Sequence, residues 1–261
     1  MQAPSNGLNM PHVAPGPTFH RAYPTADQSA QAWSVDAVEP RASSWSVSAS
    51  KRVLDFSVAL VGALLLALPM MVLAFCVRAS STGPAFFVQK RVGRRGHLFG
   101  LYKFRSMTIG SSSGLGLTKL GDDRVTGFGR VMRKFKLDEL PQFYNILRGE
   151  MSLVGPRPKL RRYEPMAYMP YRPGITGAAT LVFRHEEELL GRIHPSEIDR
   201  FYATHIQPLK AQIDSEYMSE ATLWSDFGII AATFLACLAP SRNSLALGAE
   251  EDQDAATSIS A

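Results

Sequence analysis

Two adjacent carboxylates, Asp138 and Glu139, lie in a part of the chain that is otherwise rich in cations. A basic, helix-like segment precedes them, and a Gly-Pro-Arg-Pro turn that contains Arg157 follows them. Adjacent acids among arginines suit a metal-assisted reaction on a phosphate ester. One carboxylate can attack phosphorus while the other holds a hard cation such as Mg²⁺ through oxygen. This spacing by itself names no reaction.

Four cations are candidates for binding a phosphate or a nucleotide. Two of them are arginines: Arg133 lies one helical turn before the acids, and Arg157 lies in the turn after them. A guanidinium can donate to two phosphate oxygens at once. Lys103 and Arg105 alternate with apolar residues, so a strand over this segment would point both cations to one face. We therefore predict that these four residues surround the two acids.

Two helices are expected to position the acids. Apolar residues recur at helical spacing from about Thr126, and basic residues occupy the remaining positions. This pattern breaks at Leu137, and Asp138 falls where the N-cap of a second helix, 139–147, would lie. In one interpretation Asp138 is a helix cap and nothing more. In the other it belongs to a phosphate site, since a helix N-terminus offers free N–H groups and a partial positive charge.

The apolar run from Val53 to Val77 is long enough to cross a hydrocarbon core of about 30 Å as a helix. Pro69 lies in its middle, where proline removes one helical hydrogen bond and favours a kink. Basic residues flank both ends of the run, and the positive-inside rule would place both flanks on the cytoplasmic side. A re-entrant helix over 51–80, kinked at Pro69, satisfies both observations. A straight span that tolerates Pro69 is the alternative.

The remainder of the 261 residues fits one domain. Residues 1–50 are rich in Ala, Ser, Pro and Gly, and residues 243–261 are small and polar, so both segments are expected to be disordered. A catalytic domain is expected over 81–242. Within it, the apolar stretch 227–238 is too short to span a membrane and suits an interfacial helix.

The formal charge of +5 and the pI near 9.3 fit a phosphorylated substrate or an anionic lipid as partner. Nucleic acid is not expected, because no zinc, helix-turn-helix or RNP-like pattern accompanies the basic clusters. Two other functions remain open: a membrane-anchored adaptor without catalysis, and a membrane-bound phosphodiesterase or phosphatase. His185 and the three glutamates after it are interpreted as a surface acidic run on a helix, not as a metal site.

Seven sequence blocks, taken in order, resemble the bacterial sugar transferase family, the monotopic phosphoglycosyl transferases that start polysaccharide and glycoconjugate synthesis. The resemblance covers about residues 51 to 240. Blocks of this length in this order are highly specific. They are Lys51–Phe56, Gly83–Gly93, Tyr102–Met107, Asp123–Gly129, Leu137–Gln142, Met151–Pro158 and Arg172–Gly177.

The resemblance implies transfer of a sugar-1-phosphate from a UDP-sugar to polyprenyl (undecaprenyl) phosphate, with release of UMP. It implies a covalent phosphosugar intermediate on Asp138, with Glu139 helping to hold Mg²⁺. Arg133 and Arg157 would bind phosphate, and Lys103 would belong to the basic wall of the site. The implied fold is α+β and predominantly helical, with a re-entrant membrane helix broken at a proline and no Rossmann unit.

The resemblance also implies a place in the bacterial inner membrane, with the catalytic domain on the cytoplasmic side. The product would enter exopolysaccharide, capsule, O-antigen or glycoconjugate assembly, and the resemblance leaves room for a homodimer and for downstream glycosyltransferases as partners. Two departures stand out. Leu68 precedes Pro69 where the family often has serine, and residues 178–188 differ from the common family pattern, so the sugar stays open.

Overall fold

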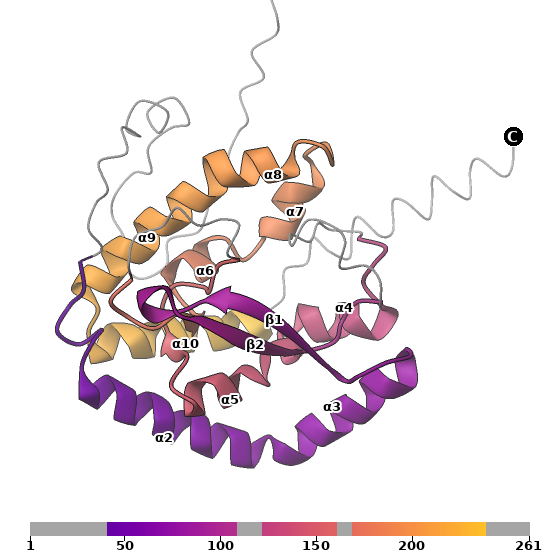
Figure 1. Ribbon diagram of the computed structural model, residues 1–261, viewed down its shortest axis with the longest axis horizontal. Coiled ribbons are helices and arrows are strands. Elements are labelled where there is room, and N and C mark those ends of the chain that lie inside the picture. The colour runs from indigo at the N-terminus through magenta and orange to yellow at the C-terminus, as the bar shows by residue number, and fades with distance from the viewer. Residues whose placement is uncertain (1–40, 109–121, 161–168, 239–261) are drawn as a thin grey trace, which may run out of the picture. The chain divides into compact units, whose positions relative to one another are not determined.

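The computed structural model describes residues 41–108, 122–160 and 169–238 (Figure 1). The predicted disordered tail, 243–261, and most of the predicted N-terminal segment lie outside these residues. Residues 41–50 are an exception to the expected disorder. The Trp45 indole nitrogen donates to Asp226 at 2.8 Å, and the Ser46 hydroxyl donates to the Met218 carbonyl at 2.8 Å. These tertiary hydrogen bonds order a stretch whose composition alone suggested disorder.

The apolar run forms two helices, α2 (Ala49–Leu65) and α3 (Ala67–Ser80), which meet at a bend of 62° (Figure 1). The break is at Leu66, three residues before Pro69, so the run is not one straight helix and the bend is not at the proline itself. A proline ring clashes with the carbonyl four residues earlier, which here is Leu65, the last residue of α2. That Pro69 causes the bend therefore remains a prediction with a physical reason.

Among the described residues, no single helix combines the length and the apolarity needed to cross a membrane, and α2 and α3 meet that requirement only as a bent pair. Many apolar side chains of the two helices are exposed, and they include Val53, Val61, Leu64, Leu65, Leu68, Met71 and Phe75. The re-entrant arrangement predicted for 51–80 stays a prediction.

The strands form two small sheets in the described part of the chain. Strands β1 (Phe86–Val92) and β2 (Leu98–Phe104) pair antiparallel, and β3 (Ser152–Val154) and β4 (Gly174–Thr176) pair parallel. The turn between β1 and β2 holds the short helix η1 (Arg94–Gly96). Two small sheets among many helices confirm the predicted α+β, predominantly helical class, and neither sheet is a Rossmann unit.

Most of the remaining structure is helical. The helix predicted from Thr126 is α4 (Gly127–Lys134), with the Thr126 hydroxyl accepting from the Gly129 N–H. The apolar stretch near the C-terminal end is α10 (Leu223–Leu238), in which Trp224 is 79% exposed. The other elements are η3 (Leu137–Glu139), α5 (Gln142–Leu147), α6 (Ala178–Val182), α7 (Glu186–Gly191), α8 (Ile198–Phe201), η5 (Tyr202–Ile206) and α9 (Gln207–Glu220).

Two apolar clusters hold these elements together. The larger contains Ile146, Met151 and Met218 and joins α2, α5, β2, β3, α9 and α10. The smaller is built on Val77, Phe104 and Met132, with Leu137 packed against it. This smaller cluster joins α3, β2 and α4 around η3, the turn that carries both predicted catalytic acids.

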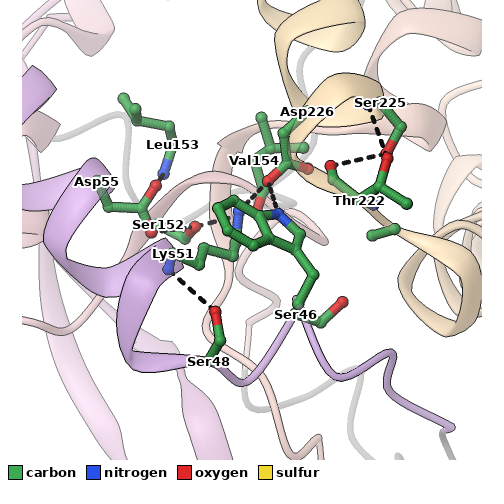
Figure 2. A network of polar contacts seen from close by, with 12 residues as sticks. Ser46, Ser48, Lys51, Asp55, Ser152, Leu153, Val154, Thr222, Ser225 and Asp226 are labelled. Carbon is green, nitrogen blue, oxygen red and sulfur yellow. Dashed lines mark hydrogen bonds and ion pairs between the residues drawn. The ribbon is translucent and has the colours of Figure 1, made fainter.

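A buried polar network fixes the start of α2 to the rest of the domain (Figure 2). The Lys51 ammonium pairs with the Asp226 carboxylate of α10, which also accepts from the Tyr217 hydroxyl at 2.6 Å. One turn later, Asp55 accepts from the Ser152 hydroxyl at 2.7 Å and from the Leu153 N–H at 3.1 Å. These contacts tie the helix pair to α10 and β3, the strand that leads into the Gly-Pro-Arg-Pro turn.

Candidate active site

Asp138 and Glu139 lie in the 3-10 turn η3, between α4 and α5. Lys136 adopts a left-handed conformation with φ of 56°, which ends α4 and turns the chain into η3. A left-handed residue after a helix is usually glycine or asparagine, so a lysine here carries some backbone strain. Both acids are buried, with 6% of Asp138 and 7% of Glu139 exposed.

Asp138 does not cap a helix. The helix after the acids begins only at Gln142, its N-cap position is held by Pro141, and no side chain caps it. The capping interpretation is therefore wrong, because residues 137–139 close their own turn first. Within the described chain, Asp138 Oδ1 is buried and has no hydrogen-bond partner. Buried carboxylate oxygens are nearly always paired in proteins, so this atom is a candidate contact for a ligand.

Glu139, in contrast, is paired with two cations. Arg157 donates to it from both terminal nitrogens: Nη2 to Oε1, and Nη1 to Oε2 at 3.3 Å. Lys103 Nζ is 3.5 Å from the same Oε1. Burial alone would raise the pKa of Glu139, but Arg157 and then Lys103 outweigh it and hold that pKa well below its usual range. Glu139 is therefore an anion across the physiological pH range.

The pKa of Asp138 moves the opposite way. Burial raises it, and the charge of Glu139 raises it further, while Lys103, Arg133 and Lys136 partly oppose the shift. Two neighbouring acids with pKa values pushed apart are typical of sites in which each acid has its own role. Here the geometry separates the two roles: Glu139 holds the cations, and Asp138 keeps an oxygen free.

Lys103 reaches this pair from β2, as predicted for the basic wall of the site. Burial lowers the pKa of Lys103 to about 8, and Glu139 opposes that shift. Lys103 is thus the cation of the site that can lose its charge at a mildly alkaline pH.

Arg157 is positioned by the pairing of β3 with β4. Gly155 N–H donates to the Thr176 carbonyl at 2.9 Å, and Gly174 N–H donates to the Pro156 carbonyl at 2.9 Å. The two backbones pass so closely that a Cβ on Gly174 would lie 2.2 Å from the Gly155 nitrogen. Two of the sequence blocks therefore fold as one unit that presents Arg157 to Glu139.

Arg133 is close enough to lower the pKa of Asp138, but its guanidinium pairs with Glu187 of α7. Glu186 of the same helix pairs with Lys210 of α9. The acidic run after His185 is therefore more than a solvated helix face, because two of its members bind cations of other elements. Sequence spacing gave no sign of these pairs, since each partner lies far away along the chain.

Arg105 does not join the group around Glu139. Its Nη2 donates to the carbonyl and the hydroxyl of Ser81, at 2.7 and 2.9 Å, beyond the end of α3. The structure thus brings Lys103, Arg133 and Arg157 toward the acids and directs Arg105 toward α3. Gln142 was not predicted as a site residue. It is buried four residues after Asp138, and its Nε2 lacks a hydrogen-bond partner within the described part.

The donor set suits Mg²⁺ bound together with a substrate. In the described residues no group of three or more His, Cys, Asp or Glu side chains is arranged to hold a metal on its own. Mg²⁺ is usually held by one or two carboxylates plus substrate phosphates. Glu139 would supply a carboxylate to such a site, and the free Oδ1 of Asp138 lies on the neighbouring residue.

Comparison with known proteins identifies the family of this chain. The sequence model of the bacterial sugar transferases matches residues 46–240. A galactosyl transferase (CpsE) of Streptococcus agalactiae is 36% identical over 203 residues, which are 70% of this chain and 41% of the relative. A UDP-N-acetylgalactosamine-undecaprenyl-phosphate N-acetylgalactosaminephosphotransferase of Aeromonas hydrophila is 35% identical over 193 residues, 70% of this chain and 42% of the relative.

A UDP-glucose:undecaprenyl-phosphate glucose-1-phosphate transferase of Caulobacter vibrioides is 36% identical over 197 residues, which are 72% of this chain and 69% of the relative. The chain thus spans about two fifths of the length of the first two relatives and about two thirds of the third. The matched region contains every predicted site residue. This chain belongs to the bacterial sugar transferase family.

Proposed function

We propose that this chain transfers a sugar-1-phosphate from a UDP-sugar to polyprenyl phosphate and releases UMP. The observation that carries the proposal is the contrast between the two acids. Asp138 is buried with one carboxylate oxygen free, while Glu139 is locked to Arg157 and Lys103. The printed names of two relatives, which act on undecaprenyl phosphate, support the same reaction class.

Asp138 is the nucleophile in this proposal. A free Oδ oxygen forms a bond to the sugar-bearing phosphorus of the UDP-sugar while the bond from that phosphorus to UMP breaks, and the electron pair leaves with UMP. A phosphate oxygen of the polyprenyl phosphate then attacks the same phosphorus. The bond to Asp138 breaks, the carboxylate is restored, and a polyprenyl diphosphate sugar forms.

The cations of the site bind and orient the donor. Arg157 and Lys103 meet at Glu139, and their positive charge lies where phosphate oxygens must come close to Asp138. Arg133 can turn from Glu187 to a phosphate, because its surface partner is only weakly held. Glu139 would help to hold Mg²⁺ together with the substrate phosphates, and the metal would supply positive charge to stabilise the departing phosphate.

The helix pair α2 and α3 supports a membrane location. We propose that it enters and leaves the bacterial inner membrane on the cytoplasmic side, where the lipid acceptor is found. Its exposed apolar residues and the bend at Leu66 fit that arrangement. Cysteine labelling of residues 1–50 tests it: labelling from the periplasmic side would contradict re-entry. A homodimer and contacts with downstream glycosyltransferases remain proposals.

The decisive experiment measures UMP release by the detergent-purified full chain, given Mg²⁺, polyprenyl phosphate and a panel of UDP-sugars. Asp138→Asn is expected to abolish release, and Asp123→Asn, which changes an exposed acid outside the site, is the matched control. Glu139→Gln is expected to lower the rate and to raise the Mg²⁺ concentration that is needed.

Each alternative function predicts a different result in this assay. Release that needs one UDP-sugar, the lipid and Asp138 supports the transferase and identifies its sugar. Sustained turnover without lipid would indicate a phosphodiesterase or phosphatase that uses water as acceptor. Release by none of the donors, together with an unchanged cellular role in Asp138→Asn, would indicate an adaptor.

A further inference from the structure

Arg105 is a buried cation without an acidic partner in the part of the chain that the structure describes. The residue is 7% exposed, and its Nη2 contacts only Ser81 and, at 3.4 Å, the Val77 carbonyl. The Nε and Nη1 atoms are buried and have no hydrogen-bond partner among the described residues. These two atoms carry three of the five N–H donors of the guanidinium.

Such an arrangement is costly unless an anion completes it. A guanidinium keeps its charge at every physiological pH, and buried charges in proteins are normally paired and hydrogen-bonded. The carbonyls at the C-terminal end of α3 offset part of the charge, as is common at helix ends. These carbonyls accept only from Nη2, however. The N–H groups of Nε and Nη1 therefore still need acceptors such as phosphate oxygens.

The position of Arg105 connects the two acids with the helix pair. The Arg105 N–H donates to the Ala85 carbonyl at 2.8 Å, so the chain is still paired with the segment before β1. Arg105 therefore lies about 7 Å beyond Lys103 along an extended chain and starts from the same face. Between them, Phe104 packs in one cluster with Leu137, the residue before Asp138.

We propose that Arg105 binds the phosphate monoester of the lipid acceptor, at a site next to the one that holds the UDP-sugar diphosphate. The inference rests on the proposed function. Arg157 and Lys103 face Glu139 and serve the donor, whereas Arg105 faces the end of α3, from which a lipid phosphate would approach. Its unused donors bind the acceptor phosphate while one oxygen of that phosphate attacks the phosphorus on Asp138.

Measuring the two half-reactions separately shows whether Arg105 binds the lipid acceptor or the UDP-sugar donor. The first half-reaction exchanges labelled UMP into the UDP-sugar and needs no lipid, whereas the second requires the lipid acceptor. In Arg105→Lys and Arg105→Met, we expect UMP exchange to stay within about twofold of wild type. Transfer to polyprenyl phosphate is expected to fall by about tenfold or more, the effect of losing a charge-assisted hydrogen bond, with a raised KM for the lipid.

The control is Arg148→Met, which removes an exposed arginine that pairs with Glu150 outside the site and should leave both half-reactions unchanged. Equal losses of exchange and transfer in the Arg105 variants would overturn the inference, because Arg105 would then serve the donor or the fold. Unchanged transfer would overturn it as well, since Arg105 would then only cap α3.

A binding measurement covers the case in which Arg105→Met fails to fold. Arg105→Lys keeps the charge, and its folding is checked by thermal unfolding. Farnesyl phosphate, a short polyprenyl phosphate, is titrated into both proteins, and inorganic phosphate and UMP are tested separately as competitors. We expect Arg105→Lys to bind farnesyl phosphate about tenfold more weakly and UMP unchanged.

The competitors identify what the site recognises. Displacement of farnesyl phosphate by inorganic phosphate supports recognition of the phosphate itself, and failure of inorganic phosphate to compete would overturn that recognition. Displacement by UMP would overturn the assignment to the acceptor. If the wild type exchanges no UMP but binds farnesyl phosphate through Arg105, the proposed reaction fails while this site stands.

Discussion

Arg157 donates to the carboxylate of Glu139 from both terminal nitrogens of its guanidinium, and Asp138, the residue just before Glu139 in the chain, keeps one buried oxygen free. Two adjacent acids thus have opposite surroundings. Glu139 is paired with two cations and stays ionised, and Asp138 is buried with one oxygen free.

Replacing Arg157 by methionine should leave Glu139 with Lys103 as its remaining ion-pair partner among the described residues. We expect the free energy of unfolding to fall by about 1–3 kcal/mol, less than for a fully buried pair because the Arg157 side chain is 40% exposed. Chemical denaturation at pH 7 measures the change. In the control Arg157→Met/Glu139→Gln, which removes the unpaired charge, part of the stability should return.

The same pair has a defined pH dependence. The folded-state pKa of Glu139 is lowered relative to its unfolded value of about 4.3. The pairing therefore stabilises the fold fully above that value, and the contribution is lost as the pH falls below it. Unfolding curves of wild type and Arg157→Met should converge at acidic pH. A constant difference down to the lowest pH at which both fold would contradict this assignment.

Loss of the positive charge of Lys103 should reduce the activity at alkaline pH. Burial lowers its pKa to about 8, Glu139 and Asp138 oppose this shift, and Arg157 and Arg91 add to it. Because only the charged form attracts phosphate, kcat/KM for the UDP-sugar should fall as the pH rises through about 8. In Lys103→Arg the side chain keeps its charge over this whole pH range. The fall in kcat/KM above a pH of about 8 should therefore disappear, even if the rate itself is lower. If the alkaline fall in kcat/KM persists in Lys103→Arg, it is caused by the titration of another group.

Gly174→Ala should disturb the contact that positions Arg157. The added Cβ would lie 2.2 Å from the Gly155 nitrogen and 2.5 Å from the Thr176 carbonyl oxygen, so the two backbones must separate. We expect a loss of about 1–3 kcal/mol or more in the free energy of unfolding, with a further loss of UMP release while the protein is still folded.

Gly228→Ala is the matched control for this substitution. A Cβ at that position in α10 meets nothing within 4 Å, and alanine favours a helix over glycine by about 1 kcal/mol. Its melting temperature should therefore stay the same or rise. Equal destabilisation by both variants would argue that the β3–β4 contact has no special role.

Asp226→Asn should weaken the attachment of α2 to the domain. The substitution removes the ion-pair partner of the buried Lys51 ammonium, which costs about 3–5 kcal/mol in comparable buried pairs. Thermal unfolding in detergent measures the loss. The double variant Lys51→Met/Asp226→Asn should lose less than the sum of the two single variants, because it removes both members of the ion pair. Additive losses would show that the two residues act independently.

The local patterns of the sequence predicted the local structure well. The helix expected from Thr126 is present with Thr126 as its cap, and the alternation around Lys103 corresponds to β2. The mostly helical class and the family are confirmed as well. These features depend on neighbours along the chain, through helical spacing, strand alternation and contiguous blocks, and such neighbours are visible in a sequence.

Only the tertiary structure decided which charges meet. It joined Arg157 to Glu139, gave Arg133 a partner in Glu187, and placed the Arg105 guanidinium against Ser81. It also showed that Asp138 is not a helix cap and that the bend lies at Leu66. Each outcome depends on which distant elements pack together and exclude water. The sequence by itself determined which acids and cations are candidates for chemistry, and long-range packing decided how they are paired.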